Sequence, residues 1–365
     1  MFDFSDDLGP AKVIEVYDPG TPLRAVVVVD NVAVGPAIGG VRMAVDATTE
    51  ECFRLARAMT LKNAAAGLAH GGGKSVVVAD PTLPVERKEV LLRSFARAIA
   101  DVRDYIPGPD MGTNEAAMAW IRDEIGRAVG LPRDIGGIPL DEIGATGVGL
   151  VAAIEAAQEF SGVRIDRARV VVQGFGSVGI HAARLLVARG ARLVGVADSG
   201  GARVDPDGFD VADLVAFKRA GRSVATYPRG RAIAAADLVE VDCDIWIPAA
   251  RPDVLRADNV DRVKAMVIAQ GANIPATAEA ERRLAERGVC VIPDFIANAG
   301  GVICAAVEYH GGTQEQALAA IVSKIGANTR EVLARAANER ALPRDVAIAM
   351  AVERVKRAMS YRRHS

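Results

Sequence analysis

The chain has 365 residues, of which half are hydrophobic and a quarter charged, and its formal net charge is -2. This length favours two domains, and the balanced charge argues against nucleic acid or an acidic membrane as a partner. The N-terminus begins with acidic residues instead of a secretory signal, and no charge-free stretch reaches the roughly 18 residues of a spanning helix. We therefore expect a cytoplasmic globular protein.

The predicted elements begin with strands at 24–29 and 75–79 that alternate with helices at 50–66 and 84–100. From about Gly144 an alanine-rich helix leads into a second series, in which helices alternate with strands at 169–173, 193–197, 245–247, 266–269 and 289–292. Such alternation predicts a parallel, doubly wound sheet. Residues 314–359 are predicted to be helical apart from Pro343 and to return to the first domain.

These elements predict two α/β domains about a cleft. Residues 1–138, joined by C-terminal helices at about 335–365, are assigned to a substrate-binding and catalytic domain. Residues 139–334 are assigned to a Rossmann dinucleotide-binding domain. The four cysteines are widely spaced without a Cys-x-x-Cys pair and the four histidines are scattered, so we expect buried free thiols and no metal site.

A strand, a glycine-rich turn and a helix follow one another from residue 169, which is the context that a dinucleotide-binding fingerprint requires. The glycines allow a tight turn, close approach of a pyrophosphate and close helix packing. The residues of this predicted cofactor site are Gly174, Gly176, Ser177, Val178 and Gly179. A tight turn without a ligand is the alternative interpretation.

The next strand ends at Asp198, about 24 residues after Gly174, where a carboxylate would accept hydrogen bonds from the adenine ribose. Its charge would also repel a 2′-phosphate, so NAD is the expected cofactor. NADP stays open as an alternative, because Ser199-Gly200-Gly201 and Arg203 could provide room and charge for the phosphate.

Three glycine-rich segments of the first domain carry polar residues, and each is predicted to be a loop. They are Gly39-Gly40 with Arg42, Gly71-Gly72-Gly73 with Lys74, and Pro107-Gly108-Pro109 with Asp110. Lysine is rare in this chain, and both Lys62 and Lys74 lie in apolar surroundings, where the pKa of a lysine shifts readily. Taken singly, the segments are also consistent with ordinary turns and with lysines whose charged ends reach solvent.

Longer motifs connect these segments. Leucine dehydrogenases resemble the chain in Gly35-Pro-Ala-Ile-Gly-Gly-Val-Arg-Met, Met59-Thr-Leu-Lys-Asn-Ala-Ala-Ala-Gly-Leu and Gly71-Gly-Gly-Lys. Glutamate dehydrogenases are more similar in Gly144-Ala-Thr-Gly, Ile247-Pro-Ala-Ala, Gln270-Gly-Ala-Asn and Pro293-Asp-Phe-Ile-Ala-Asn-Ala-Gly-Gly. The whole chain thus resembles the glutamate, leucine, phenylalanine and valine dehydrogenase superfamily, whose members form homo-oligomers and deaminate L-amino acids reversibly.

The resemblance implies that Lys74 and Asp110 are catalytic and that Lys62 holds the substrate α-carboxylate. A base that works near neutral pH is needed for water to add to an imine, and a lysine that is partly desolvated beside a second cation has a lowered pKa. Further residues that the resemblance places at the substrate are Gly40, Met59, Asn273 and Ile296. Those that face the nicotinamide, its ribose or the bound amino acid are Thr146, Ala249, Asn273 and Asn298.

The expected substrate has a small apolar side chain. Glutamate dehydrogenases of this superfamily place a lysine immediately before the Gly-Gly pair and a serine after Asn-Ala-Gly-Gly, and these groups hold the distal carboxylate. Here the two positions are Ile38 and Ala305. We therefore expect leucine, valine or isoleucine as the substrate, with phenylalanine also allowed. Glutamate is the first alternative, and a catalytically silent nucleotide-binding regulator is the second.

Overall fold

The computed structural model describes residues 4–362. Contacts between residues divide the chain into two compact units. Unit 1 consists of Met1–Leu140, Val302–Ala317 and Ile348–Ser365, and unit 2 consists of Asp141–Gly301 and Leu318–Ala347. Three helices belong partly to unit 1 and partly to unit 2: α9 (Gly300–Tyr309), α10 (Gln314–Glu339) and α11 (Pro343–Ser360).

Unit 1 is built on a five-stranded mixed sheet, in the order β1-β2-β4-β3-β5. Strand β3 runs parallel to both β4 and β5, whereas β2 is antiparallel to β1 and β4. The strands are β1 (Lys12–Asp18), β2 (Leu23–Asn31), β3 (Ala37–Ala44), β4 (Gly71–Val78) and β5 (Tyr105–Pro109). The helices of this part of the chain are α1 (Thr49–Ala65), α2 (Val85–Ala98), α3 (Glu115–Ile125) and the single 3-10 turn η1 (Arg133–Ile135).

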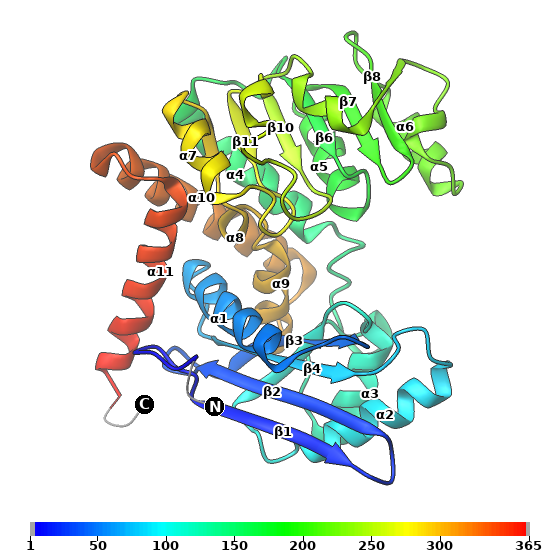
Figure 1. Cartoon of the computed structure of the whole chain (residues 1–365), viewed down its shortest axis with the longest axis vertical. Coiled ribbons are helices and arrows are strands. Elements are labelled where there is room, and N and C mark those ends of the chain that lie inside the picture. Colours follow the sequence, from blue (N-terminus) through cyan, green and yellow to red (C-terminus); the bar gives the residue numbers. More distant parts are fainter. Residues whose placement is uncertain (1–3, 363–365) are drawn as a thin grey trace. The chain divides into compact units, whose positions relative to one another are not determined.

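Helices cover both faces of this sheet, with α1 on one face and α2 and α3 on the other (Figure 1). Successive side chains of a strand point to opposite faces, so the continuous valine run of β2 supplies both cores. Val28 packs with Cys52 and Phe53 of α1. Val27 packs in a separate cluster with Phe95 of α2 and other buried residues. The apolar run of β2 therefore reflects a strand that is buried on both sides.

The glycine-rich segments of unit 1 are strands rather than the predicted loops. Gly39 lies in β3, and Gly72 and Gly73 lie in β4. A Cβ atom on Gly39 would stand 1.7 Å from the carbonyl oxygen of Gly73, and one on Gly72 would stand 2.0 Å from the backbone nitrogen of Thr60 in α1. Glycine is therefore needed here for close packing of backbones, which composition alone does not distinguish from a turn.

Unit 2 contains a seven-stranded sheet in the order β12-β11-β10-β6-β7-β8-β9. The first five strands of this order are parallel, whereas β8 and β9 extend the sheet as antiparallel strands, an edge that the predicted parallel sheet lacked. The strands are β6 (Arg169–Gln173), β7 (Arg192–Asp198), β8 (Gly201–Val204), β9 (Arg231–Ile233), β10 (Ile245–Pro248), β11 (Val267–Ala269) and β12 (Cys290–Ile292).

The connections of unit 2 form a doubly wound fold. Its helices are α4 (Ala145–Ser161), α5 (Ser177–Val187), α6 (Val211–Arg219), α7 (Ala278–Glu286) and α8 (Asp294–Ala297), with 3-10 turns η2 (Val224–Thr226), η3 (Ala235–Glu240) and η4 (Val260–Arg262). Strand β6 pairs with β7 on one side and with β10 on the other, so the strand order reverses at β6. Ligands of such sheets bind at the carboxyl ends of the strands beside this reversal.

Within residues 4–362, no helix is long and apolar enough to cross a membrane, and no three His, Cys, Asp or Glu side chains are grouped to hold a metal ion. All four cysteines are free thiols. Three of them are buried, whereas Cys290 is only half-buried because it begins the edge strand β12.

Candidate active site

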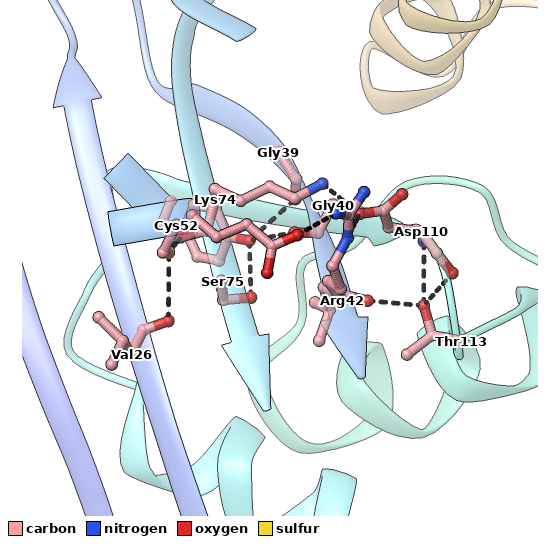
Figure 2. A network of polar contacts seen from close by, with 12 residues as sticks. Val26, Gly39, Gly40, Arg42, Cys52, Lys74, Ser75, Asp110 and Thr113 are labelled. Atoms are coloured by element: carbon pink, nitrogen blue, oxygen red, sulfur yellow. Dashed lines mark hydrogen bonds and ion pairs between the residues drawn. The ribbon is translucent and has the colours of Figure 1, made fainter. Parts of the chain in front are cut away.

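In unit 1, the side chains of Lys74, Asp110 and Arg42 meet above β3 and β4 (Figure 2). The Lys74 ammonium donates a 2.5 Å hydrogen bond to Oδ2 of Asp110, and Nε of Arg42 donates a 3.0 Å hydrogen bond to the same oxygen. A second carboxylate, that of Glu51 in α1, accepts a bond from the other end of the Arg42 guanidinium. Lys74 is only 5% exposed, so its charge is largely removed from water.

The electrostatics of this cluster favour a lysine that can lose its proton. Burial lowers the pKa of Lys74 below its ordinary value, the nearby Asp110 opposes that change, and the positive charge of Arg42 adds to the lowering. Burial acts against the charged form of Asp110, but Lys74 and Arg42 together outweigh it and hold the pKa of Asp110 below its usual range. The pair can therefore supply a base and an anionic hydrogen-bond acceptor side by side.

Neighbouring residues hold the cluster in place. A Cβ atom on Gly40 would lie 2.8 Å from Cβ of Asp110 and 3.0 Å from Nζ of Lys74, so only glycine leaves room for the pair. The buried Tyr105 hydroxyl donates a hydrogen bond to the Gly39 carbonyl, which supports β3 from below. The Thr113 hydroxyl accepts from the Asp110 backbone N–H and donates to the Val41 carbonyl, and so ties the turn after β5 to β3.

The other predicted substrate residues of unit 1 lie on three elements. Ile38 is buried on β3, two residues before Gly40 and therefore on the same face as the Lys74–Asp110 pair. Met59 and Lys62 are half-buried and share one face of α1, the helix that packs on β4. Ala305 is buried in the part of α9 that belongs to unit 1.

In unit 2, the three fingerprint glycines differ in what surrounds them. Gly174 has a left-handed φ of 101°, and a Cβ atom on it would lie 2.7 Å from Ala249. A Cβ atom on Gly179 would lie 2.0 Å from the Gly174 carbonyl oxygen, whereas one on Gly176 would meet nothing within 4 Å. Gly174 therefore allows the tight turn, Gly179 allows the close packing of the helix, and Gly176 leaves the backbone open to a ligand.

Helix α5 begins directly after this open position, and no side chain caps its first turn. The first N–H groups of a helix have no partner within the helix and favour an anionic ligand. Ser177 and Val178 occupy these positions. The residues of this turn therefore fit a dinucleotide pyrophosphate.

The remaining predicted cofactor residues lie near the carboxyl ends of the parallel strands. The Asn298 side-chain NH2 donates to Oδ1 of Asn273 at 3.0 Å, while its own buried Oδ1 has no partner in the described residues. Such an orphaned acceptor fits a ligand with a hydrogen-bond donor. Thr146 is the second residue of α4 and lies beside Gly300, and Ala249 follows β10 beside Gly174. Ile296 is buried in α8.

A buried ionic network, which the sequence motifs did not reveal, supports Asn273. The backbone N–H of Ile274 donates to Asp294 at 2.7 Å, and Arg344 of α11 pairs with both Asp294 and Glu281. Ile274 itself has a left-handed φ of 47°, a conformation that a β-branched residue adopts at a cost. Asp294 and Arg344 therefore stabilise the strained turn that presents Asn273.

Arg42 is the other residue whose role sequence reasoning missed. The sequence analysis expected a second cation beside Lys74 without assigning it to a residue, and the structure places the Arg42 guanidinium there. A sequence signal existed, because the side chains of residues 38, 40 and 42 point to the same face of one strand. That signal becomes readable only when the Gly39-Gly40 segment is recognised as a strand.

The fold and the two groups of residues are those of a nicotinamide-dependent oxidoreductase, and unit 1 contains a buried lysine–aspartate pair. Residues 136–363 match the model of the Glutamate/Leucine/Phenylalanine/Valine dehydrogenase family, and residues 10–127 match the model of the Glu/Leu/Phe/Val dehydrogenase dimerisation domain. The chain belongs to this family. It is therefore an NAD(P)-dependent amino-acid dehydrogenase, as the motifs predicted.

Three curated relatives match most of the chain. The glutamate dehydrogenase of Aeropyrum pernix is 39% identical over 91% of this chain and 85% of the relative. The NADP-specific glutamate dehydrogenase of Saccharolobus shibatae is 38% identical over 91% and 83%, and the NAD-specific enzyme of Staphylococcus aureus is 38% identical over 76% and 70%. These names do not confirm the leucine-dehydrogenase label that the first motifs suggested.

Solved structures confirm the fold of two α/β parts, one of them Rossmann-like. A hetero-hexameric glutamate dehydrogenase from Thermus thermophilus, in a leucine-bound form, has a TM-score of 0.83 and 29% identity, covering 96% of this chain and 89% of that chain. L-tryptophan dehydrogenase from Nostoc punctiforme has a TM-score of 0.76 and 25% identity, covering 97% and 98%.

Proposed function

We propose that this amino-acid dehydrogenase oxidatively deaminates an L-amino acid with an apolar side chain to the 2-oxo acid and ammonia, and catalyses the reverse reaction. The main observation that supports this reaction is the buried Lys74–Asp110 pair with Arg42 beside it. A lysine with a lowered pKa is the base that hydration of an imine requires near neutral pH. Intact catalytic residues also argue against a silent regulatory homologue.

Each charged residue of the proposed site in unit 1 has a distinct role in the reaction. When NAD or NADP is bound, its nicotinamide supplies the acceptor for the hydride from the substrate Cα. Neutral Lys74 takes a proton from the water that attacks the substrate imine, and Asp110 carries protons between the substrate nitrogen and solvent. Lys62 binds the α-carboxylate, which stays charged throughout the reaction. Arg42 keeps Asp110 ionised and oriented through the 3.0 Å bond.

The proposed coenzyme residues of unit 2 follow the chemistry of their atoms. The N–H groups at the start of α5 bind the pyrophosphate beside the open Gly176. Asn273 and Asn298 contribute amide groups on the nicotinamide side, where Asn298 has an unused acceptor. Thr146 and Ala249 are the other two residues that we assign to the nicotinamide side.

An apolar substrate side chain is favoured by Ile38, which is 3% exposed and shares a face of β3 with Gly40. A second carboxylate next to Ile38 and Ala305 would lose several kcal/mol of hydration without a cation to replace it. The Arg42 guanidinium is already engaged by two carboxylates. An aliphatic side chain instead gains roughly 0.8 kcal/mol for each methylene that it buries.

Glutamate is the second candidate substrate, and the comparisons favour it over leucine or valine, because the three relatives are glutamate dehydrogenases. The two candidates are separated by kcat/KM for leucine, valine, isoleucine, phenylalanine and glutamate. We expect an aliphatic substrate to be best on the wild type, and Ile38→Lys with Ala305→Ser to raise the activity on glutamate. Ile38→Leu with Ala305→Val is the matched control. Glutamate as the best wild-type substrate would establish the second candidate instead.

Self-association is also part of this proposal. The matched model for residues 10–127 describes a dimerisation domain, and the Thermus thermophilus relative is hetero-hexameric. We infer a homo-oligomer on this basis.

A further inference from the structure

Four charged side chains of unit 1 form one continuous row, although the proposed reaction uses only three of them. Lys74 and Arg42 both donate to Oδ2 of Asp110, at 2.5 and 3.0 Å (Figure 2). The other end of the Arg42 guanidinium donates to Oε1 of Glu51 at 2.5 Å. The row therefore begins at Glu51 in α1 and ends at Lys74 in β4, and its charges alternate in sign.

Glu51 makes this row electrically neutral. It adds a second anion to two cations and the anion of Asp110. The exposed fraction of the side chain is 37% at Glu51 and 17% at Arg42, and it is only 6% at Lys74. Burial of an unbalanced charge is costly. A carboxylate at the solvent side of the row therefore offsets the positive charge of Arg42 while losing little of its own hydration.

Two charged groups dominate the surroundings of Lys74. Burial lowers the pKa of Lys74. The ionisable side chains that act on this lysine are Asp110, Arg42 and Cys52. Burial raises the pKa of the Cys52 thiol to about 12, so Cys52 carries no charge at neutral pH. The charges that remain are those of Asp110 and Arg42, and Glu51 contacts Arg42 directly.

Glu51 also connects the row to the helix that is proposed to contact the substrate. It lies in the first turn of α1, where its backbone N–H donates to the Thr48 hydroxyl at 3.1 Å. Met59 and Lys62 lie further along the same helix. The bond from Arg42 to Glu51 therefore joins the start of this helix to β3.

We propose that Glu51 is a positioning residue of this site, which holds the Arg42 guanidinium in place and offsets its positive charge at Lys74. This role rests on the proposed function, because Lys74 is taken as the base of the reaction. Glu51 has no assigned contact with the substrate, so its influence on turnover passes through Arg42. A purely structural Glu51 would anchor α1 to β3 without changing the pH dependence of turnover.

The first test is the pH profile of kcat/KM for Glu51→Gln. Glutamine keeps an oxygen that accepts from Arg42 but removes the negative charge, so the added net positive charge favours neutral Lys74. The rise of kcat/KM with pH should therefore move to lower pH by about half a unit or more, the size of one charge effect in a partly buried site. A rise that stays in place, or moves to higher pH, would overturn the proposal.

The matched control is Glu50→Gln, which removes an exposed carboxylate from the same turn of α1. This variant should move the rise by less than about 0.2 of a unit, because solvent and salt screen an exposed charge. A shift as large as that of Glu51→Gln would overturn the proposal, since any acid at the start of α1 would then have the same effect.

A double-variant cycle shows whether Glu51 acts through Arg42. Arg42→Met removes the guanidinium, and in this background Glu51→Gln should move the rise less than about half as far as it does in the wild type. A shift of full size would overturn the proposal, because Glu51 would then act on Lys74 independently of Arg42.

A readout without turnover separates the role of Glu51 from the proposed function. Only a neutral amine reacts with acetic anhydride, so the rate at which a trace of this reagent acetylates Lys74, followed by mass spectrometry of peptides, reports the protonation of that lysine. The acetylation profile should move to lower pH in Glu51→Gln and stay in place in Glu50→Gln. These shifts in a protein that deaminates no amino acid would support the coupling of Glu51 to Lys74 and overturn the proposed function. An active enzyme whose acetylation profile does not move in Glu51→Gln would overturn only the role of Glu51.

Discussion

Lys74 and Asp110 share one short hydrogen bond in a nearly dry environment, and the proposed chemistry depends on both. Lys74→Ala and Asp110→Asn should each lower kcat by about three orders of magnitude, because general acid and base contributions reach that size. Coenzyme titrations on the same variants should give wild-type affinities, since unit 2 is unchanged. Turnover close to that of the wild type in either variant would reject its assigned role.

The pH profile should report the protonation state of Lys74. Only the neutral amine accepts a proton, so kcat/KM for deamination should rise with pH and level off below the ordinary lysine pKa of 10.5. Burial is the main cause of the lowered pKa of Lys74, and the charge of Arg42 adds to it. Arg42→Met should therefore move the rise to higher pH. Arg42→Lys keeps a positive charge and should move it less. An unshifted profile in Arg42→Met would contradict the role of Arg42.

At the scale of the elements, replacing each of two glycines by alanine should affect stability differently. Gly39→Ala places a Cβ atom 1.7 Å from a backbone oxygen of β4, so β3 and β4 must separate and the free energy of unfolding should fall by at least about 2 kcal/mol. Gly176→Ala meets nothing within 4 Å and should unfold at the wild-type temperature.

The same Gly176→Ala variant should bind coenzyme more weakly, because its methyl group occupies the open approach to α5. Calorimetric melting and coenzyme titration of both variants check the pair of expectations. A destabilised Gly176→Ala, or one with unchanged coenzyme affinity, would show that this glycine serves packing instead of ligand binding.

For the whole molecule, the prediction concerns mass in solution. A homo-oligomer should give a mass by light scattering of at least twice the 38.2 kDa of the chain. Its melting temperature should rise with protein concentration, because association stabilises the folded state by mass action. A monomer at every concentration up to that of an ordinary assay would contradict the inferred self-association.

Local signals account for what could be predicted from sequence. The β-branched runs, the helical spacing and the turn before α5 lie within short segments, where backbone preference and burial pattern agree. Family motifs placed Lys74, Asp110 and the fingerprint glycines at positions whose surroundings suit the expected chemistry. The predicted loops around Gly39 and Gly72 were wrong, because glycine marks a close backbone approach as well as a turn, and only the neighbouring backbone distinguishes the two.

The sequence by itself determined the class of enzyme, the order of its α/β elements and the residue types of the proposed site, since these follow from contiguous motifs. Only the tertiary structure decided which charges meet. Arg42 reaches Asp110 across 68 residues, Lys218 reaches Asp198 across 20, and Arg344 reaches Glu281 across 63. Coulombic energy depends on the distance between charges and on their exclusion from water. Neither quantity is defined along the chain until strands and helices have packed.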